Sequence, residues 1–247
     1  MILRLESTAM LPRLAAVVLV AAALRACASY EYEHEIWLNV DGSGTVNVTG
    51  RPALWTAFKS LPLDAEGDPD ATKRAARELF ERSGLQVNRV TLTTRRGQRY
   101  LFVSAEFRDV NRISYTPAFP DLRVGLRREA GRLQLDGSWQ RPLEALAGGE
   151  QDRDGQMAVR FHLSSKVYRH RRAAFGVERG NILGWLQDSS AALDGGRLEF
   201  GAEMDERSIL SSTVLLFVGA VLLAVMLLAF GLWAVVRRGK KDLARSR

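Results

Sequence analysis

One dense group of cationic side chains has the composition of an anion-binding site. Four permanent positive charges fall within seven residues, beside Tyr168: Lys166, Arg169, Arg171 and Arg172. An arginine can hold a phosphate with two parallel N–H donors, so these side chains are candidate contacts for an anionic headgroup. Along a strand, Arg169 and Arg171 would point the same way and Arg172 the opposite way. A solvated strand end balanced by acidic residues elsewhere is the alternative interpretation.

Cys27 is the only cysteine, and its neighbours are compatible with two kinds of processing. The segment Leu24-Arg25-Ala26-Cys27 resembles a bacterial lipobox, in which the cysteine is lipidated, with Arg25 in place of the usual small or apolar residue. The segment Ala26-Cys27-Ala28 equally fits the A-x-A cleavage site of a secretory signal peptide. Lipidation of Cys27 and cleavage after Ala28 both remain open.

The residues that catalysis or metal binding would need do not form a recognisable motif. The histidines His34, His162 and His170 form no H-E-x-x-H pair, and His34 and His162 fall in strand patterns as ordinary face residues. The sequence has no G-x-S-x-G or S-x-x-K nucleophile motif and no phosphate-binding G-x-x-x-x-G-K-[ST] loop. We therefore expect a non-catalytic domain without a metal or cofactor.

The net charge of +7 resides at the two ends of the chain. Residues 29–207 contain 26 basic and 26 acidic side chains, whereas residues 1–28 carry +2 and residues 208–247 carry +5. A neutral domain has no net field to attract a polyanion, so nucleic acid is not an expected partner.

The apolar segments near the two ends differ in length. Residues 14–24 follow Arg4 and Arg13 and would form a helix of only about 16 Å, too short to cross a bilayer core of about 30 Å. This order predicts a signal peptide over residues 1–28. Residues 213–236 contain no charge and would form a helix of about 36 Å, which is long enough to span.

Basic residues directly after the second apolar segment indicate the orientation of the chain. Residues 237–241 read Arg-Arg-Gly-Lys-Lys, and such clusters stay on the cytoplasmic side. We therefore predict a single-pass protein of a bacterial cell membrane. Its parts are a signal peptide (1–28), an exported domain (29–207), a polar link with the transmembrane helix (208–236) and a cytoplasmic tail (237–247).

Period-two patterns dominate the exported domain, which predicts an α+β fold with an antiparallel sheet and one main covering helix. Residues 30–40 and 45–49 predict a hairpin around Asp41-Gly42-Ser43-Gly44. The main helix is expected from Pro69 to Ser83, with Asp68 as its N-cap and Gly84 after its end. Further strands are expected at residues 86–94, 98–107, 122–128, 132–139, 157–168 and 197–204, short helices after Pro52 and over residues 110–115, and an exposed loop over 146–155.

The chain resembles the LppM-like bacterial envelope proteins in three features. These are the DGSG hairpin after a signal cysteine, the segment Val177-Glu178-Arg179-Gly180-Asn181-Ile182-Leu183-Gly184-Trp185, and a single closing helix. The resemblance implies an α+β domain that binds an amphiphilic envelope molecule, and it supplies no catalytic residues. The expected function is thus a membrane-anchored domain that binds a lipid or glycolipid. The alternative is a structural or interaction protein that docks other envelope proteins.

Overall fold

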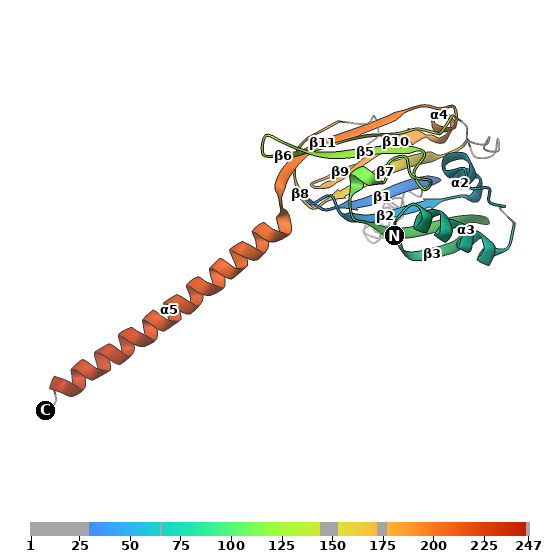
Figure 1. The fold of residues 1–247 in the computed structure, drawn as a ribbon. Coiled ribbons are helices and arrows are strands. Elements are labelled where there is room, and N and C mark those ends of the chain that lie inside the picture. Colours follow the sequence, from blue (N-terminus) through green and yellow to red (C-terminus); the bar gives the residue numbers. More distant parts are fainter. Residues whose placement is uncertain (1–29, 65, 144–152, 172–176, 246–247) are drawn as a thin grey trace, which may run out of the picture.

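A computed structural model describes residues 30–64, 66–143, 153–171 and 177–245 (Figure 1). These residues form two β-sheets, several helices and one long C-terminal helix. The larger sheet contains β1 (Tyr32–Leu38), β2 (Gly44–Gly50), β3 (Gln86–Arg95), β4 (Gln98–Phe107), β7 (Gln156–Leu163), β9 (Val177–Arg179) and β10 (Ile182–Asp188). The smaller sheet contains β5 (Leu122–Glu129), β6 (Arg132–Trp139), β8 (Ser165–His170) and β11 (Leu198–Ser208). The strand orders are β3-β4-β2-β1-β7-β10-β9 and β5-β6-β11-β8.

The β1–β2 hairpin forms where the alternation and the turn residues predict it. Every second residue of β1 from Tyr32 to Leu38 is buried, and the strand pairs antiparallel with β2. In the turn, the Asp41 carboxylate accepts hydrogen bonds from the backbone N–H and hydroxyl of Ser43. The residue after the turn must be a glycine, because a Cβ at Gly44 would lie 2.0 Å from the Trp37 carbonyl oxygen.

Two helices cover part of the larger sheet. The predicted main helix is α3 (Pro69–Arg82), and Asp68 caps it by accepting from two backbone N–H groups. Gly84 takes the positive φ of +78° that ends such a helix without a Cβ clash. The shorter α2 (Pro52–Lys59) follows β2 directly. Together with the mostly antiparallel sheets, these helices confirm the α+β prediction.

The structure corrects the expectation of one strand over residues 157–168. The chain forms β7 in the larger sheet, turns at Ser164, and continues as β8 in the smaller sheet. Ser164 donates its N–H to the Leu38 carbonyl and accepts from the N–H of Ile209. A strand that changes sheets at a corner keeps its period of two, so the pattern alone does not reveal the change. β7 also pairs parallel with β1, so the larger sheet is not entirely antiparallel as predicted.

Aromatic side chains fill the centre of the core between the two sheets. Tyr32 of β1 stacks on Trp139 of β6 with ring centroids 5.8 Å apart, and Phe58 of α2 lies 4.8 Å from Trp139. Phe161 and Phe200 meet at 5.3 Å on the other side of the core. All five side chains are buried. These contacts fix the smaller sheet against β1 and α2.

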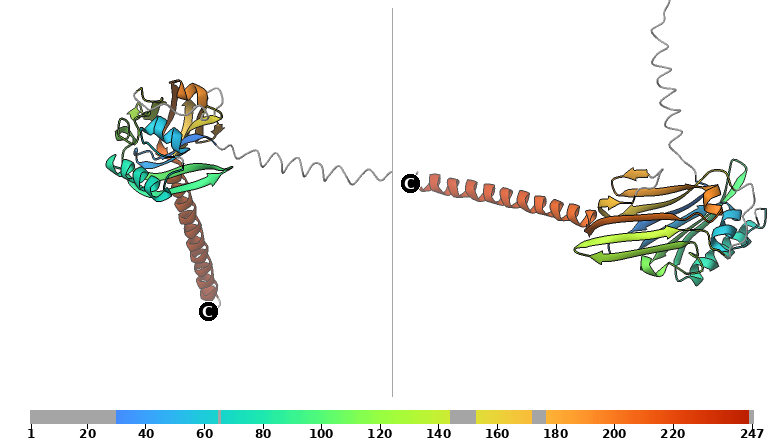
Figure 2. Two further views of the ribbon diagram at one scale, coloured as in Figure 1. Left: turned by 90° about the vertical axis from the view of Figure 1, so that its right-hand side faces the viewer. Right: turned by 90° about the horizontal axis from the view of Figure 1, so that it is seen from above.

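The last strand continues directly into the long helix α5 (Ile209–Arg245), with no loop between them. β11 ends at Ser208 and α5 begins at the next residue. Within α5, residues Thr213–Gly231 have a mean hydropathy of 2.9, and none of this stretch is buried by the domain. Its length and composition are those of a membrane-spanning helix. Figure 2 shows that the strands run roughly along the direction in which α5 leaves the domain.

Three other elements complete the described chain. The 3₁₀ helix η1 (Val110–Arg112) forms within the short helix predicted over residues 110–115. The segment with the LppM-like motif forms the hairpin β9–β10, and α4 (Ser189–Leu193) follows it. The predicted signal peptide, Cys27, Arg172 and most of the predicted loop over residues 146–155 lie outside the described residues.

Candidate functional site

The outward face of the smaller sheet carries a hollow of about 490 Å³ that is rich in arginine. Its cationic side chains come from three separate places: Arg123 on β5, Arg171 just after β8, and Arg197 just before β11. Ser114 and Ser138 add hydroxyl groups, and Asp136 and Glu199 add carboxylates. Such a mixture can donate hydrogen bonds to phosphate oxygens and accept them from hydroxyl groups.

Tyr115 forms an aromatic surface at the edge of this hollow. Its side chain is 77% exposed, and its backbone adopts a φ of +67°, which is unusual for a residue with a Cβ. The Arg123 guanidinium lies 3.5 Å from the Tyr115 ring centroid. It also donates to the backbone carbonyls of Phe119, Pro120 and Leu122. The positions of Arg123 and Tyr115 are therefore set before any ligand binds.

Two of the arginines share one carboxylate. Arg171 pairs with Glu199, and the Nε atom of Arg197 lies 3.7 Å from the same carboxylate. The Arg171 backbone N–H also donates to Gly201 at 2.8 Å, which holds the residue against β11. Because one negative charge faces two positive charges here, this side of the hollow has an excess of positive charge.

The structure divides the basic cluster predicted from the sequence into two parts. Arg169 and Arg171 line a smaller adjoining hollow of about 200 Å³, together with Asp136 and Glu203. Lys166 lies at the opposite end of β8, near the start of α5, because Ser165 pairs with Ser208. Among the described members of the cluster, Arg169 and Arg171 therefore line one hollow and Lys166 does not.

Sequence reasoning missed Arg123, Arg197 and Tyr115. Arg123 and Arg197 stand in separate strand patterns, where single arginines are ordinary surface residues. Tyr115 lies in a turn after η1. Only the pairing of β5 with β6, and of β6 with β11, brings these positions to one face.

A second group of titratable side chains is enclosed in the core. The Lys59 ammonium lies 2.7 Å from Asp121 Oδ1 and 2.9 Å from His34 Nε2. The Trp139 indole N–H donates to Asp121 Oδ2 at 2.9 Å. All four residues are at most 2% exposed. This network therefore joins β1, α2 and the β5–β6 hairpin, and it has no access for a substrate.

The protonation state of this network follows from burial and from its charges. Burial lowers the pKa of His34 well below its usual value, and the neighbouring Lys59 lowers it further. His34 is therefore neutral, and its Nε2 accepts from Lys59. Burial raises the pKa of Asp121, while the Lys59 charge opposes that shift. The sequence placed His34 correctly on a strand face but did not reveal its partners.

Carboxylates also gather on the outward face of the larger sheet. Glu33 Oε1 lies 2.8 Å from Arg160 Nη2, and Glu35 Oε1 lies 3.2 Å from Arg160 Nη1 and 2.9 Å from His162 Nε2. Trp37 stacks on His162 with centroids 4.5 Å apart. Burial raises the pKa of Glu33 to about 7, although Arg160 opposes the shift and Glu35 adds to it.

The raised pKa of Glu33 predicts a pH-dependent stability. Folded Glu33 binds a proton between pH 4.5 and about 7 that the unfolded chain releases, so its contribution to stability is lost as pH rises through this range. Glu33→Gln should match the unmodified protein near pH 4.5 and exceed its free energy of unfolding by about 2–3 kcal/mol at pH 8. Urea unfolding at several pH values measures the difference, and parallel curves for the two proteins would contradict the prediction.

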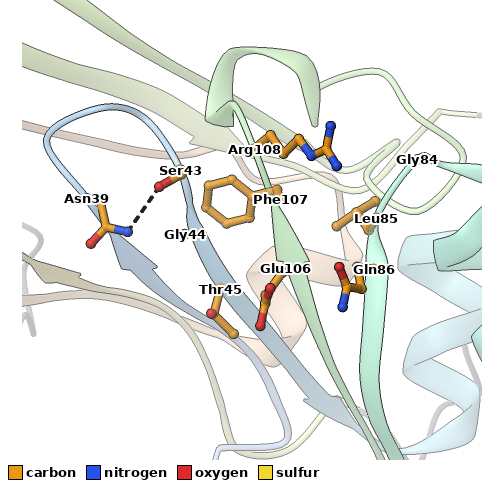
Figure 3. A pocket seen from close by; sticks show the side chains of 10 residues that line it. All are labelled: Asn39, Ser43, Gly44, Thr45, Gly84, Leu85, Gln86, Glu106, Phe107 and Arg108. Atoms are coloured by element: carbon orange, nitrogen blue, oxygen red, sulfur yellow. Dashed lines mark hydrogen bonds between the residues drawn. The ribbon is translucent and has the colours of Figure 1, made fainter.

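A further hollow of about 600 Å³ lies beside the β1–β2 turn (Figure 3). Its lining includes Asn39 and Ser43 from the turn and Glu106, Phe107 and Arg108 at the end of β4. Asn39 donates to the Ser43 hydroxyl at 3.1 Å. The hollow offers one cation and one carboxylate, and therefore has less excess positive charge than the face around Arg171.

In the part of the chain that the structure describes, no group of three or more His, Cys, Asp or Glu side chains is arranged to hold a metal ion.

Comparison with known proteins gives one distant structural similarity. No protein-family profile and no curated protein matches the chain. Among solved structures, the domain is similar to the NMR structure of the folded domain of the Mycobacterium tuberculosis LppM protein, with a TM-score of 0.39 and 14% sequence identity. The match covers 70% of this chain and 88% of that one. This is a weak link at the level of the fold.

Proposed function

We propose that this protein is a non-catalytic envelope domain, anchored in a bacterial cell membrane by α5, that binds the polar headgroup of a lipid or glycolipid. The domain lies outside the membrane and the basic tail inside, as the positive-inside rule predicts. The headgroup binds on the outward face of the smaller sheet. The observation that carries this proposal is the grouping of Arg123, Arg171 and Arg197 around one hollow beside the exposed ring of Tyr115.

The chemistry of this face fits a headgroup that contains both phosphate and hydroxyl groups. Arg169 and Arg171 supply donors for phosphate oxygens, and Asp136 supplies an acceptor for hydroxyl groups. The stacked Tyr32, Phe58 and Trp139 rings fill the centre of the domain, which is why we assign the ligand to the surface.

The position of the site along β11 indicates how the ligand arrives. Arg171 is bonded to Gly201, eight residues before the start of α5. At about 3.3 Å per strand residue, the site lies about 25 Å from the beginning of the helix. A headgroup embedded in the same bilayer would not reach it, so the ligand binds as a single molecule away from that bilayer.

Short-chain lipids below their micelle-forming concentration therefore provide the test. Dihexanoyl-phosphatidylglycerol should bind the detergent-solubilised full chain, and dihexanoyl-phosphatidylcholine should bind more weakly. Arg169→Gln combined with Arg171→Gln should weaken binding of the anionic lipid about tenfold or more, because each charge-assisted contact contributes up to about 1.5–3 kcal/mol before screening. Calorimetry or fluorescence titration would give the dissociation constants.

The matched control is Arg74→Gln with Arg82→Gln, which removes the same charge from the exposed face of α3. This control should bind the anionic lipid as the unmodified protein does. If both double variants bind it equally well, the face around Arg171 is a solvated surface. That outcome would favour the alternative function, in which the domain docks other envelope proteins.

A further inference from the structure

Cationic and aromatic side chains gather at the end of the domain from which α5 leaves. We call Arg128, Arg132, Lys166, Tyr168 and Arg207 the collar. Strand pairing sets their position: Asp205 pairs with Arg132, and Ser208 pairs with Ser165. Each collar residue therefore lies on the last residues of β11 or beside them. Figure 1 shows the β5–β6 hairpin reaching this same end of the domain.

The distance from the collar to the apolar part of α5 is short. The helix begins at Ile209 and its apolar stretch begins at Thr213, so about 6 Å of helix separates them. The headgroup layer on one side of a bilayer is about 5–7 Å thick. If Thr213 stands at the edge of the hydrocarbon core, Ile209 and the end of β11 stand within the headgroups.

The junction also holds the domain to the helix. The Ile209 N–H donates to the Ser164 carbonyl at 2.9 Å, and the Ser208 hydroxyl donates to the same oxygen at 3.2 Å. No loop lies between β11 and α5 that would let the domain move away from the bilayer. The collar therefore faces the membrane surface directly.

The collar has the chemistry of a membrane interface. The Tyr168 ring is 41% exposed and lies between two cations, 4.1 Å from Arg132 and 5.3 Å from Lys166. Its hydroxyl donates to Asp205 at 2.8 Å. Amphipathic rings and long cationic side chains are the groups that concentrate at headgroup level.

The ion pairs made by Glu203 and Glu206 leave two collar cations available to bind lipid headgroups. Glu203 pairs with Arg132, and Glu206 pairs with Arg128 at 3.0 Å. Over the described residues, no carboxylate lies within ion-pair distance of Lys166 or Arg207, and both side chains are exposed. Asp205 attracts Arg207 electrostatically, but its two oxygens already accept hydrogen bonds from the Tyr168 hydroxyl and the Arg207 backbone N–H. Two exposed cations at headgroup level, neither held in an ion pair, have anionic lipid as their natural counter-charge.

We propose that Lys166 and Arg207 bind anionic phospholipid headgroups of the bilayer that α5 crosses, and so hold the domain upright on the membrane. This surface is separate from the face around Arg171. The inference rests on the membrane span of the proposed function but does not depend on the headgroup site.

The small number of lysines gives a direct test. The chain has five: Lys59 is buried, Lys73 lies on α3, Lys166 belongs to the collar, and Lys240 and Lys241 lie in the tail. The full chain would be reconstituted in nanodiscs of phosphatidylcholine, alone or mixed with phosphatidylglycerol. Amine acetylation would then be followed by mass spectrometry. Lys166 should react about fivefold more slowly in the anionic nanodiscs, and Lys73 should react equally in both.

A variant and an insertion assay separate the ways in which the proposal fails. Arg207→Gln should reduce the protection of Lys166, and Arg74→Gln on α3 should not change it. Equal Lys166 reactivity in both nanodiscs, with α5 still resisting alkaline carbonate extraction from membranes, would overturn the collar and leave the span intact. Extraction by carbonate would overturn the span and the collar together. Binding of soluble dihexanoyl-phosphatidylglycerol would be unaffected by Arg207→Gln in either case.

Discussion

Replacing Asp121 with Asn should lower the free energy of unfolding by about 3 kcal/mol or more. The reason is that Lys59 would stay buried beside a neutral side chain, without the carboxylate that now lies 2.7 Å away. The change also weakens the link between the β5–β6 hairpin and β1, because Asp121 bonds both Lys59 and Trp139. Urea unfolding at pH 7, followed by near-ultraviolet circular dichroism of the buried aromatic rings, measures the loss.

Two controls test this explanation. Lys59→Met combined with Asp121→Asn removes both charges and keeps an acceptor for the Trp139 N–H, so it should recover most of the lost stability. Lys73→Met with Asp70→Asn removes an exposed ion pair of 2.6 Å on α3 and should cost less than about 1 kcal/mol. An Asp121→Asn protein as stable as the exposed-pair control would show that the buried charges are not coupled as described.

Arginine at both Leu222 and Val225 should abolish stable membrane insertion. Both positions lie near the middle of the stretch Thr213–Gly231 and are exposed, so either charge would meet lipid. Each arginine at the centre of a span costs about 2.5–3.5 kcal/mol of insertion free energy, and the two together exceed what the remaining apolar residues supply.

Alkaline carbonate extraction of membranes gives the readout. The unmodified protein should stay in the membrane pellet, and the double arginine variant should appear in the supernatant or be degraded. Leu222→Ala with Val225→Ala keeps the segment apolar and should remain in the pellet. A double arginine variant that still resists extraction would mean that α5 is not the membrane anchor.

The sequence by itself determined the features that depend on neighbouring residues. The β1–β2 hairpin follows from alternation and turn chemistry within twenty residues, and α3 follows from a local cap, an apolar stripe and a terminal glycine. The apolar stretch of α5 is equally local, because length and composition decide whether a helix can span a bilayer. In each case the interactions that fix the element lie within the element or beside it.

Tertiary structure decided which strands and side chains meet. Lys59 contacts His34 and Asp121, which are 25 and 62 positions away in the chain. Arg123, Arg171 and Arg197 reach one hollow only because β5, β6 and β11 are neighbours. Alternation tells which face of a strand is buried, but it does not tell which strand lies beside it. For the same reason the sequence did not show that residues 157–168 divide between two sheets at Ser164. It also did not show that β11 runs directly into α5, which places Lys166 beside the start of this helix and Arg171 far from it.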